Sequence, residues 1–261
     1  MSTDDVVGDE GLWLRRFEPA GHAGNRLICF PHAGGSAAFF LPVARALAPA
    51  ADVLAVQYPG RQDRRAEPCL GDISSLADHI SRALDSSLDR PLTLFGHSMG
   101  ALIAFEVALR LQRDHPGQPA HLFVSGRRAP TRYREETVHL RDDDGIIAEV
   151  RSLGGTDARV LDDRELRDMA LPAIRGDYQA VETYRYVSGG PLRCPVTVLV
   201  GDQDPRVTPE EAMDWEKQAP EGGFDFKVFP GGHFYLTSQV AEVLTVLSDH
   251  LTSATGTGAR P

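Results

Sequence analysis

Short apolar runs alternate along this chain with longer segments in which apolar residues recur every three or four positions. The short runs have the length and composition of buried strands and occupy residues 26–30, 53–57, 92–95, 122–125, 196–200 and 224–229. The longer segments have helical periodicity and occupy residues 36–49, 73–88, 99–114, 209–218 and 238–252. Such alternation predicts an α/β fold, in which helices flank a mostly parallel central sheet.

One interval, residues 131–190, interrupts this alternation. It contains no strand-like run, but it has two amphipathic segments, at residues 142–153 and 163–184. An interval this long inside a sheet fold is usually functional, so we predict a helical lid inserted into the domain. The alternative is a set of surface helices with no gating role. We assign the whole of residues 12–254 to one domain, with flexible tails at 1–11 and 255–261.

Composition narrows the class of protein. The 261 residues are long enough for one large α/β core, and a formal net charge of −10 argues against a nucleic-acid partner. No stretch reaches the roughly 18 apolar residues of a membrane helix, and the Asp-bearing start lacks the features of a signal peptide. We therefore expect a cytoplasmic protein that does not associate with membranes. The three scattered cysteines indicate neither a disulfide framework nor a zinc site.

The candidate chemistry centres on residues 96–100, which read Gly-His-Ser-Met-Gly between a predicted strand and a predicted helix. This is the strand, tight turn and helix of the nucleophile elbow of α/β-hydrolases, in which the serine hydroxyl is held where a base can reach it. The pattern alone is weak, because Ser98 could also be an ordinary turn serine. The flanking strand and helix favour a nucleophile.

Residues that follow other predicted strands should meet Ser98, because ligands bind at the carboxyl ends of strands in such sheets. The glycine-rich turn after residue 30 and the elbow can offer the amides of Ala33 and Met99 to an oxyanion. His233 follows the last predicted strand. His32 and His97 are better explained as packing residues.

Two acids compete for the position that orients His233. Asp202 and Asp204 both follow the strand at 196–200, and the usual spacing in α/β-hydrolases favours Asp204. The order Ser98, Asp204, His233 is that of α/β-hydrolases and differs from the order in chymotrypsin or subtilisin.

Five motifs together resemble the type II thioesterases, free-standing α/β-hydrolases that accompany polyketide synthases and nonribosomal peptide synthetases. They are Phe-Pro-His-Ala-Gly-Gly-Ser at 30–36, Gln-Tyr-Pro-Gly-Arg at 57–61, Gly-His-Ser-Met-Gly at 96–100, Val-Ser-Gly-Arg-Arg-Ala-Pro at 124–130 and Pro-Gly-Gly-His-Phe at 230–234. The resemblance extends from about residue 12 to 252 and is far more specific than the elbow alone.

This resemblance implies an editing thioesterase that hydrolyses stray acyl groups from the phosphopantetheine arms of acyl or peptidyl carrier domains. It implies Ser98 as nucleophile, His233 as base and Asp204 as the acid that orients it, with the Ala33 and Met99 amides as the oxyanion hole. Neither a metal nor a cofactor is implied, and we expect a monomer. Two alternatives remain: a small-ester carboxylesterase with the same triad, and a low-turnover binding protein on a hydrolase scaffold.

Two further expectations concern substrate and partner. In the lid, Ile146, Ile147, Val150 and Met169 could line an acyl chamber over the nucleophile, although they could equally pack the lid onto the core. Carrier domains are typically acidic, so arginines near the strand ends could bind them. The candidates form two clusters: Arg61, Arg64 and Arg65, and Arg127, Arg128, Arg132 and Arg134. The alternative is that these arginines are solvated or paired within the protein.

Overall fold

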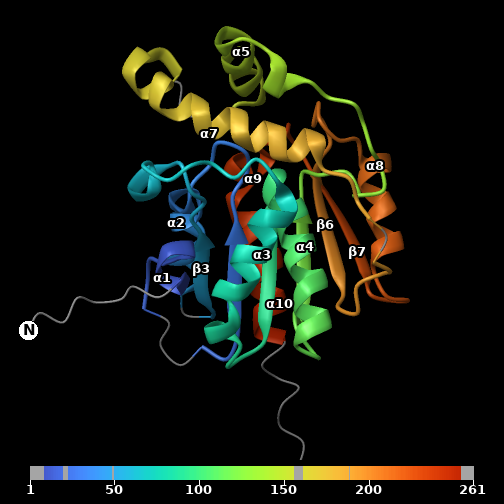
Figure 1. The fold of residues 1–261 in the computed structure, drawn as a ribbon. Coiled ribbons are helices and arrows are strands. Elements are labelled where there is room, and N and C mark those ends of the chain that lie inside the picture. Colours follow the sequence, from blue (N-terminus) through green and yellow to red (C-terminus); the bar gives the residue numbers. More distant parts are fainter. Residues whose placement is uncertain (1–8, 20–22, 49, 156–160, 188, 254–261) are drawn as a thin grey trace, which may run out of the picture.

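A seven-stranded sheet forms the centre of the computed structural model, which describes residues 9–19, 23–48, 50–155, 161–187 and 189–253 (Figure 1). The strands lie in the order β1-β3-β2-β4-β5-β6-β7. Their bounds are β1 (Leu14–Arg16), β2 (Arg26–Phe30), β3 (Asp52–Val56), β4 (Leu92–His97), β5 (His121–Ser125), β6 (Val196–Gly201) and β7 (Phe224–Phe229). β1 pairs with β3 in antiparallel fashion, and the other described pairs are parallel. The predicted α/β class is confirmed.

Helices cover both faces of this sheet. They are α1 (Asp9–Trp13), α2 (Leu41–Leu47), α3 (Ile73–Ala83), α4 (Met99–Asp114), α5 (Asp143–Leu153), α7 (Arg164–Thr183), α8 (Pro209–Met213), α9 (Tyr235–Ser238) and α10 (Val240–Ser253). In Figure 1, α3 and α4 lie in front of the sheet and α10 lies behind it. Because successive side chains of a strand point to opposite faces, β4 supplies both cores: Leu94 packs with α3 and α4, and Phe95 packs with α2 and α10.

Small side chains let α4 approach the sheet closely. Ala101, Ala104 and Ala108 are fully buried at helical spacing beneath the sheet's front face. The helix begins directly after Ser98, so its close packing also places the elbow against the neighbouring strand ends.

Two elements at the start of the described chain were not predicted. β1 has only three residues, Leu-Arg-Arg, with neither an apolar run nor a clear alternation, and it becomes a strand by pairing with β3. Residues 9–11 belong to α1 rather than to the predicted tail, whereas residues 1–8 and 255–261 lie outside the described residues. The predicted helix at 238–252 is divided, with α9 ending at Ser238 and α10 beginning at Val240.

The predicted lid segments form α5 and α7, which lie across the top of the sheet in Figure 1. Each is preceded by a capping aspartate, Asp142 or Asp163, whose side chain accepts a hydrogen bond from an amide of the first turn. The two helices share an apolar cluster separate from the two cores of the sheet. The assignment of this region as a lid remains a prediction.

At the amino end of the sheet, Asp52 joins three strands. Its buried carboxylate accepts hydrogen bonds from Arg16 of β1 at 2.9 and 3.0 Å and from Arg26 of β2 at 2.7 Å. Burial alone would raise the pKa of Asp52, but the hydrogen bonds from Arg16 and Arg26 more than offset burial and lower it below its ordinary value of 3.8.

We predict that Asp52→Asn lowers the free energy of unfolding by about 3 kcal/mol at pH 7, because the buried Arg26 loses its fully buried carboxylate partner and keeps only Asp89, which is 53% exposed. Chemical denaturation measures the change. Since the folded-state pKa of Asp52 is depressed, its contribution is present above pH 3.8 and lost as the pH falls through the folded-state pKa. The matched control is Asp78→Asn, whose side chain is 58% exposed beside Arg110. It should cost no more than about 1 kcal/mol. Equal losses in the two variants would contradict the prediction.

Candidate active site

The turn between β4 and α4 holds Ser98 in a backbone conformation that few non-glycine residues adopt. Its φ is 56° and its ψ is −114°, and its amide donates to the Ser125 carbonyl at 2.8 Å. A Cβ at Gly96 would lie 2.2 Å from the Gly100 carbonyl oxygen, and a Cβ at Gly100 would lie 2.0 Å from the Phe30 carbonyl oxygen. Only glycine fits at these two positions, so the sequence pattern follows directly from the close packing of the elbow.

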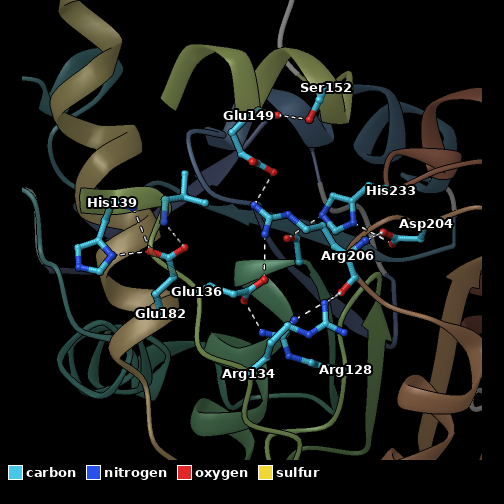
Figure 2. Close-up of polar contacts among 12 residues, drawn as sticks. Arg128, Arg134, Glu136, His139, Glu149, Ser152, Glu182, Asp204, Arg206 and His233 are labelled. Atoms are coloured by element: carbon cyan, nitrogen blue, oxygen red, sulfur yellow. Dashed lines mark hydrogen bonds and ion pairs between the residues drawn. The ribbon is translucent and has the colours of Figure 1, made fainter. Parts of the chain in front are cut away.

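The structure brings Ser98, His233 and Asp204 into one chain of hydrogen bonds. His233 Nε2 lies 2.9 Å from Ser98 Oγ, and His233 Nδ1 lies 2.8 Å from Asp204 Oδ2. Figure 2 shows the imidazole facing the Asp204 carboxylate. A carboxylate can only accept, so Nδ1 carries the proton and Nε2 is left to accept one from the serine. The second Asp204 oxygen accepts the Arg206 amide at 2.8 Å, which fixes the orientation of the carboxylate.

Asp202, the competing acid, does not contact His233. Its side chain is exposed and accepts the Gly231 amide at 2.8 Å, two residues before His233. Asp202 therefore braces the turn that carries the histidine, whereas Asp204 contacts the imidazole itself.

The turn after β2 lies directly against the elbow, because Gly100 packs on the Phe30 carbonyl. In this turn the Gly34 amide donates to Asp177 Oδ2 at 2.7 Å and the Gly35 amide to the His32 carbonyl at 2.9 Å. Met99 is the first residue of α4, where amides have no partner within the helix. Ala33 lines the same cavity as Ser98, so this arrangement is compatible with the predicted pair of oxyanion donors.

His32 and His97 form a buried aromatic wall behind His233. Burial, with smaller contributions from His233 and Arg61, lowers the pKa of His32 to about 3. Burial also lowers the pKa of His97 well below its usual range, so both rings are neutral at pH 7. The ring of His97 lies 5.1 Å from that of His233, and its Nδ1 shares a hydrogen bond with Ser125 Oγ at 2.9 Å. These contacts support the interpretation of both as packing residues.

A cavity of about 40 Å³ lies over Ser98 and His233. It has room for a few water molecules but not for an acyl chain. Arg206 forms part of its wall and connects the surrounding elements (Figure 2). Its guanidinium bridges Glu136 Oε1 at 2.9 Å and Glu149 Oε1 of α5 at 2.7 Å. The same residue thus contacts the lid region through its side chain and Asp204 through its amide.

The predicted acyl-chamber residues do not line this cavity. Ile146, Ile147 and Val150 are buried in the apolar cluster shared by α5 and α7, and Met169 is 57% exposed and lines a separate cavity between α7 and the turns after β2 and β3. Their proposed contact with substrate remains a prediction, which would require the lid to rearrange.

Leu153, an apolar residue of the predicted lid segment at 142–153, does line the cavity. The predicted lid also supplies residues that the sequence did not single out for it: Glu136, Tyr178, Val181 and Glu182. No sequence signal marked them, because the interval lacks a motif and the contacts form only when α7 lies across the strand ends. Arg206 carried one local signal, its position two residues after Asp204.

Most of the arginines expected to bind a partner have partners within the chain. Arg61 is buried and forms a bidentate pair with Asp177 of α7 at 2.5 and 2.8 Å. The others pair with acids as follows: Arg64 with Glu67, Arg128 with Glu136, Arg132 with Asp214 and Arg134 with Glu211. Among the described residues, no ion pair engages Arg65 or Arg127. These pairs favour the alternative that most of the arginines are paired within the protein, and binding of a carrier domain by either cluster remains a prediction.

Within the described ranges, no group of three or more His, Cys, Asp or Glu side chains is arranged to hold a metal ion. The described helices also include none that is long and apolar enough to cross a membrane.

Comparisons with known proteins agree with this geometry. The family model of the thioesterase domain matches residues 25–251. The chain is 52% identical to a probable cadicidin biosynthesis thioesterase of Streptomyces griseus, over 92% of this chain and 66% of that protein. It is 47% identical to thioesterase PikA5 of Streptomyces venezuelae, over 93% of this chain and 86% of that protein. The solved structure of BorB, a type II thioesterase from the borrelidin biosynthetic cluster, superposes with a TM-score of 0.86 at 51% identity, covering 92% of this chain and 98% of that one.

The Arg61–Asp177 pair yields a prediction about the lid. Asp177→Asn should lower the free energy of unfolding by about 3–5 kcal/mol, because it leaves Arg61 buried and unpaired. Asp168→Asn is the control on the same helix, since Asp168 is 56% exposed and lies 3.7 Å from Arg164. It should change stability by less than about 1 kcal/mol. Thermal and denaturant unfolding compare the two variants. A stable Asp177→Asn protein would show that this pair does not anchor α7.

Proposed function

Because this chain belongs to the thioesterase family, we propose that it hydrolyses acyl thioesters on the phosphopantetheine arms of acyl or peptidyl carrier domains, through an acyl-enzyme on Ser98. The observation that carries the catalytic part is the hydrogen-bond chain from Ser98 through His233 to Asp204 at the carboxyl edge of the sheet. The carrier-borne substrate is supported by the relatives named as type II thioesterases of biosynthetic clusters. Release of stalled or aberrant acyl groups is the role that this chemistry serves.

The first step is acylation of the serine. His233 Nε2 takes the Ser98 proton as Oγ attacks the thioester carbonyl, and Asp204 stabilises the imidazolium through Nδ1. The amides of Ala33 and Met99 bind the oxyanion of the tetrahedral intermediate. Collapse of this intermediate breaks the C–S bond, and the thiol leaves with a proton from His233.

The second step is hydrolysis of the acyl-enzyme. His233 takes a proton from water, whose oxygen attacks the acyl carbonyl, and the acid is released as Ser98 regains its proton. The cavity over Ser98, at about 40 Å³, is too small for an acyl chain, so substrate entry requires its lid-side wall to move. The bridge from Arg206 to Glu136 and Glu149 is one polar contact that such movement would break.

Ser98→Ala should lower kcat about 10⁴-fold or more toward an acyl-carrier substrate, because the triad acts as a unit. Release of acid from a radiolabelled acyl-carrier domain measures the rate, and a fluorophosphonate probe reports the activated serine independently. Ser253→Ala, an exposed position on α10, is the matched serine control and should retain both activities. Near-native turnover by Ser98→Ala would refute the acyl-enzyme. Hydrolysis of simple esters without acyl-carrier turnover would instead indicate a carboxylesterase.

The two acids give a sharper test. Asp204→Asn should lose up to about 10⁴-fold in kcat, because the amide no longer selects the imidazole tautomer that accepts from serine. Asp202→Asn should lose far less, since Asp202 contacts only the turn backbone. Both substitutions remove one negative charge and keep the side-chain shape. A larger loss of kcat in Asp204→Asn than in Asp202→Asn, measured by steady-state kinetics, would therefore come from the lost orientation of His233 and not from the changed charge of the loop. The reverse ranking would show that Asp202 is the orienting acid.

A further inference from the structure

A second cavity adjoins the one over Ser98. It has a volume of about 310 Å³ and lies between residues 127–134, which follow β5, and residues 181–186 at the end of α7. Arg127 and Val181 line both cavities, so they form the boundary between them. We call the second cavity the arginine pocket, because its walls include Arg127, Arg128, Arg132, Arg134 and Arg185.

Arg127 differs from the other arginines of the pocket in the surroundings of its side chain. Its Nε is fully enclosed without a hydrogen-bond partner, and the described residues include no acceptor or ion-pair partner for its guanidinium. Burial, with a smaller contribution from Arg128, lowers the pKa of Arg127 to about 9, so the side chain still carries its charge at pH 7. An enclosed guanidinium nitrogen without a partner is costly for a folded protein, which favours a ligand that completes it.

The backbone at this position is held in place. Trp215 Nε1 donates to the Arg127 carbonyl at 2.8 Å, and Trp215 is fully buried. The guanidinium is thus presented at the boundary of the two cavities by a rigid part of the fold, rather than by a loop free to reorient it.

The pocket as a whole is cationic. None of its described lining residues is acidic. Acids outside the pocket neutralise Arg128, Arg132 and Arg134 individually, while Arg185 stacks on the Tyr133 ring at 3.7 Å and donates to its hydroxyl. Arg127 and Arg185 therefore form no ion pair among the described residues, although Glu136 lies near enough to Arg127 to offset part of its charge, on a chain whose net charge is −10. An anionic ligand would be drawn to this pocket rather than to the rest of the surface.

We propose that the arginine pocket receives the phosphopantetheine arm of the substrate, with Arg127 hydrogen-bonded to a carbonyl oxygen of the arm and the outer arginines facing its phosphate. This inference rests on the proposed function, which places the thioester at Ser98. The arm combines amide groups with a phosphate at its far end. The arginine pocket begins at the wall of the Ser98 cavity, where the amide groups of the arm would lie. Its outer part is lined with guanidinium groups, where the phosphate would lie.

The first test compares substrates that differ only in the arm. Arg127→Met should raise KM for an acyl-phosphopantetheine about tenfold relative to its effect on the same acyl group on N-acetylcysteamine, because the short thiol lacks the outer arm. Arg164→Met, at an 87% exposed position at the other end of α7, is the control and should leave the ratio of the two KM values unchanged. Removing Arg127 leaves no partner unpaired, so the unfolding midpoint of Arg127→Met should not fall below that of the wild type.

A second variant fills the pocket without removing charge. Thr131 is exposed at its wall, and Thr131→Trp should raise KM more for acyl-phosphopantetheine than for the N-acetylcysteamine thioester. Acyl-pantetheine, which lacks the phosphate, should bind more weakly than acyl-phosphopantetheine to the wild type, and the difference should shrink with added salt. Acyl-coenzyme A and an acyl-carrier domain distinguish the free cofactor from the carrier as the source of the arm. The carrier should have the lower KM.

The outcomes separate this inference from the proposed function. If the wild type hydrolyses thioesters and the two variants affect long and short substrates equally, the arm does not occupy the arginine pocket, while the function stands. If the wild type hydrolyses neither substrate and Ser98 resists the fluorophosphonate probe, the proposed function itself fails. An acyl-pantetheine that binds as tightly as acyl-phosphopantetheine would overturn the assignment of the phosphate to the arginines.

Discussion

The active site depends on one close contact between backbones. Gly100 lies against the Phe30 carbonyl so tightly that no Cβ could be accommodated, and this contact brings the end of β2 onto the start of α4. The turn that contains Ala33 lines the same cavity as Ser98, and Ser98 occupies the tip of the elbow with a positive φ. The strain at Ser98 is stable because strands on both sides are buried and hydrogen-bonded, which leaves the elbow no relaxed alternative.

A second constraint is that charged side chains are buried beneath the predicted lid and must be paired there. Asp177 links α7 to Arg61 and to the Gly34 amide, so the helix over the cavity is tied to the turn that carries Ala33. Arg206 makes a comparable link from Asp204 to α5 through Glu149. Each link puts a charged pair between the lid and the strand ends, where removal of one partner is expensive. Any movement of the predicted lid would therefore change the geometry of the site through these few side chains.

Arginine is used in three distinct ways around the site. Arg61 is a structural partner, Arg206 connects the lid to the loop of the acid, and Arg127 has no partner among the described residues. In sequence these residues look alike. Their environments differ because burial and the nearest carboxylate determine whether a guanidinium is neutralised, shared or left for a ligand.

The sequence by itself determined the parallel sheet, the position of the elbow and the order of Ser98, Asp204 and His233. Those features are encoded locally, by apolar periodicity and by glycines that the elbow requires. It also favoured Asp204 over Asp202 through spacing. Only the tertiary structure decided that β1 is a strand, that Ile146 and Ile147 pack within the lid, and which acid each arginine meets. These outcomes depend on contacts between segments far apart in the chain, such as Arg132 with Asp214, which no local pattern records.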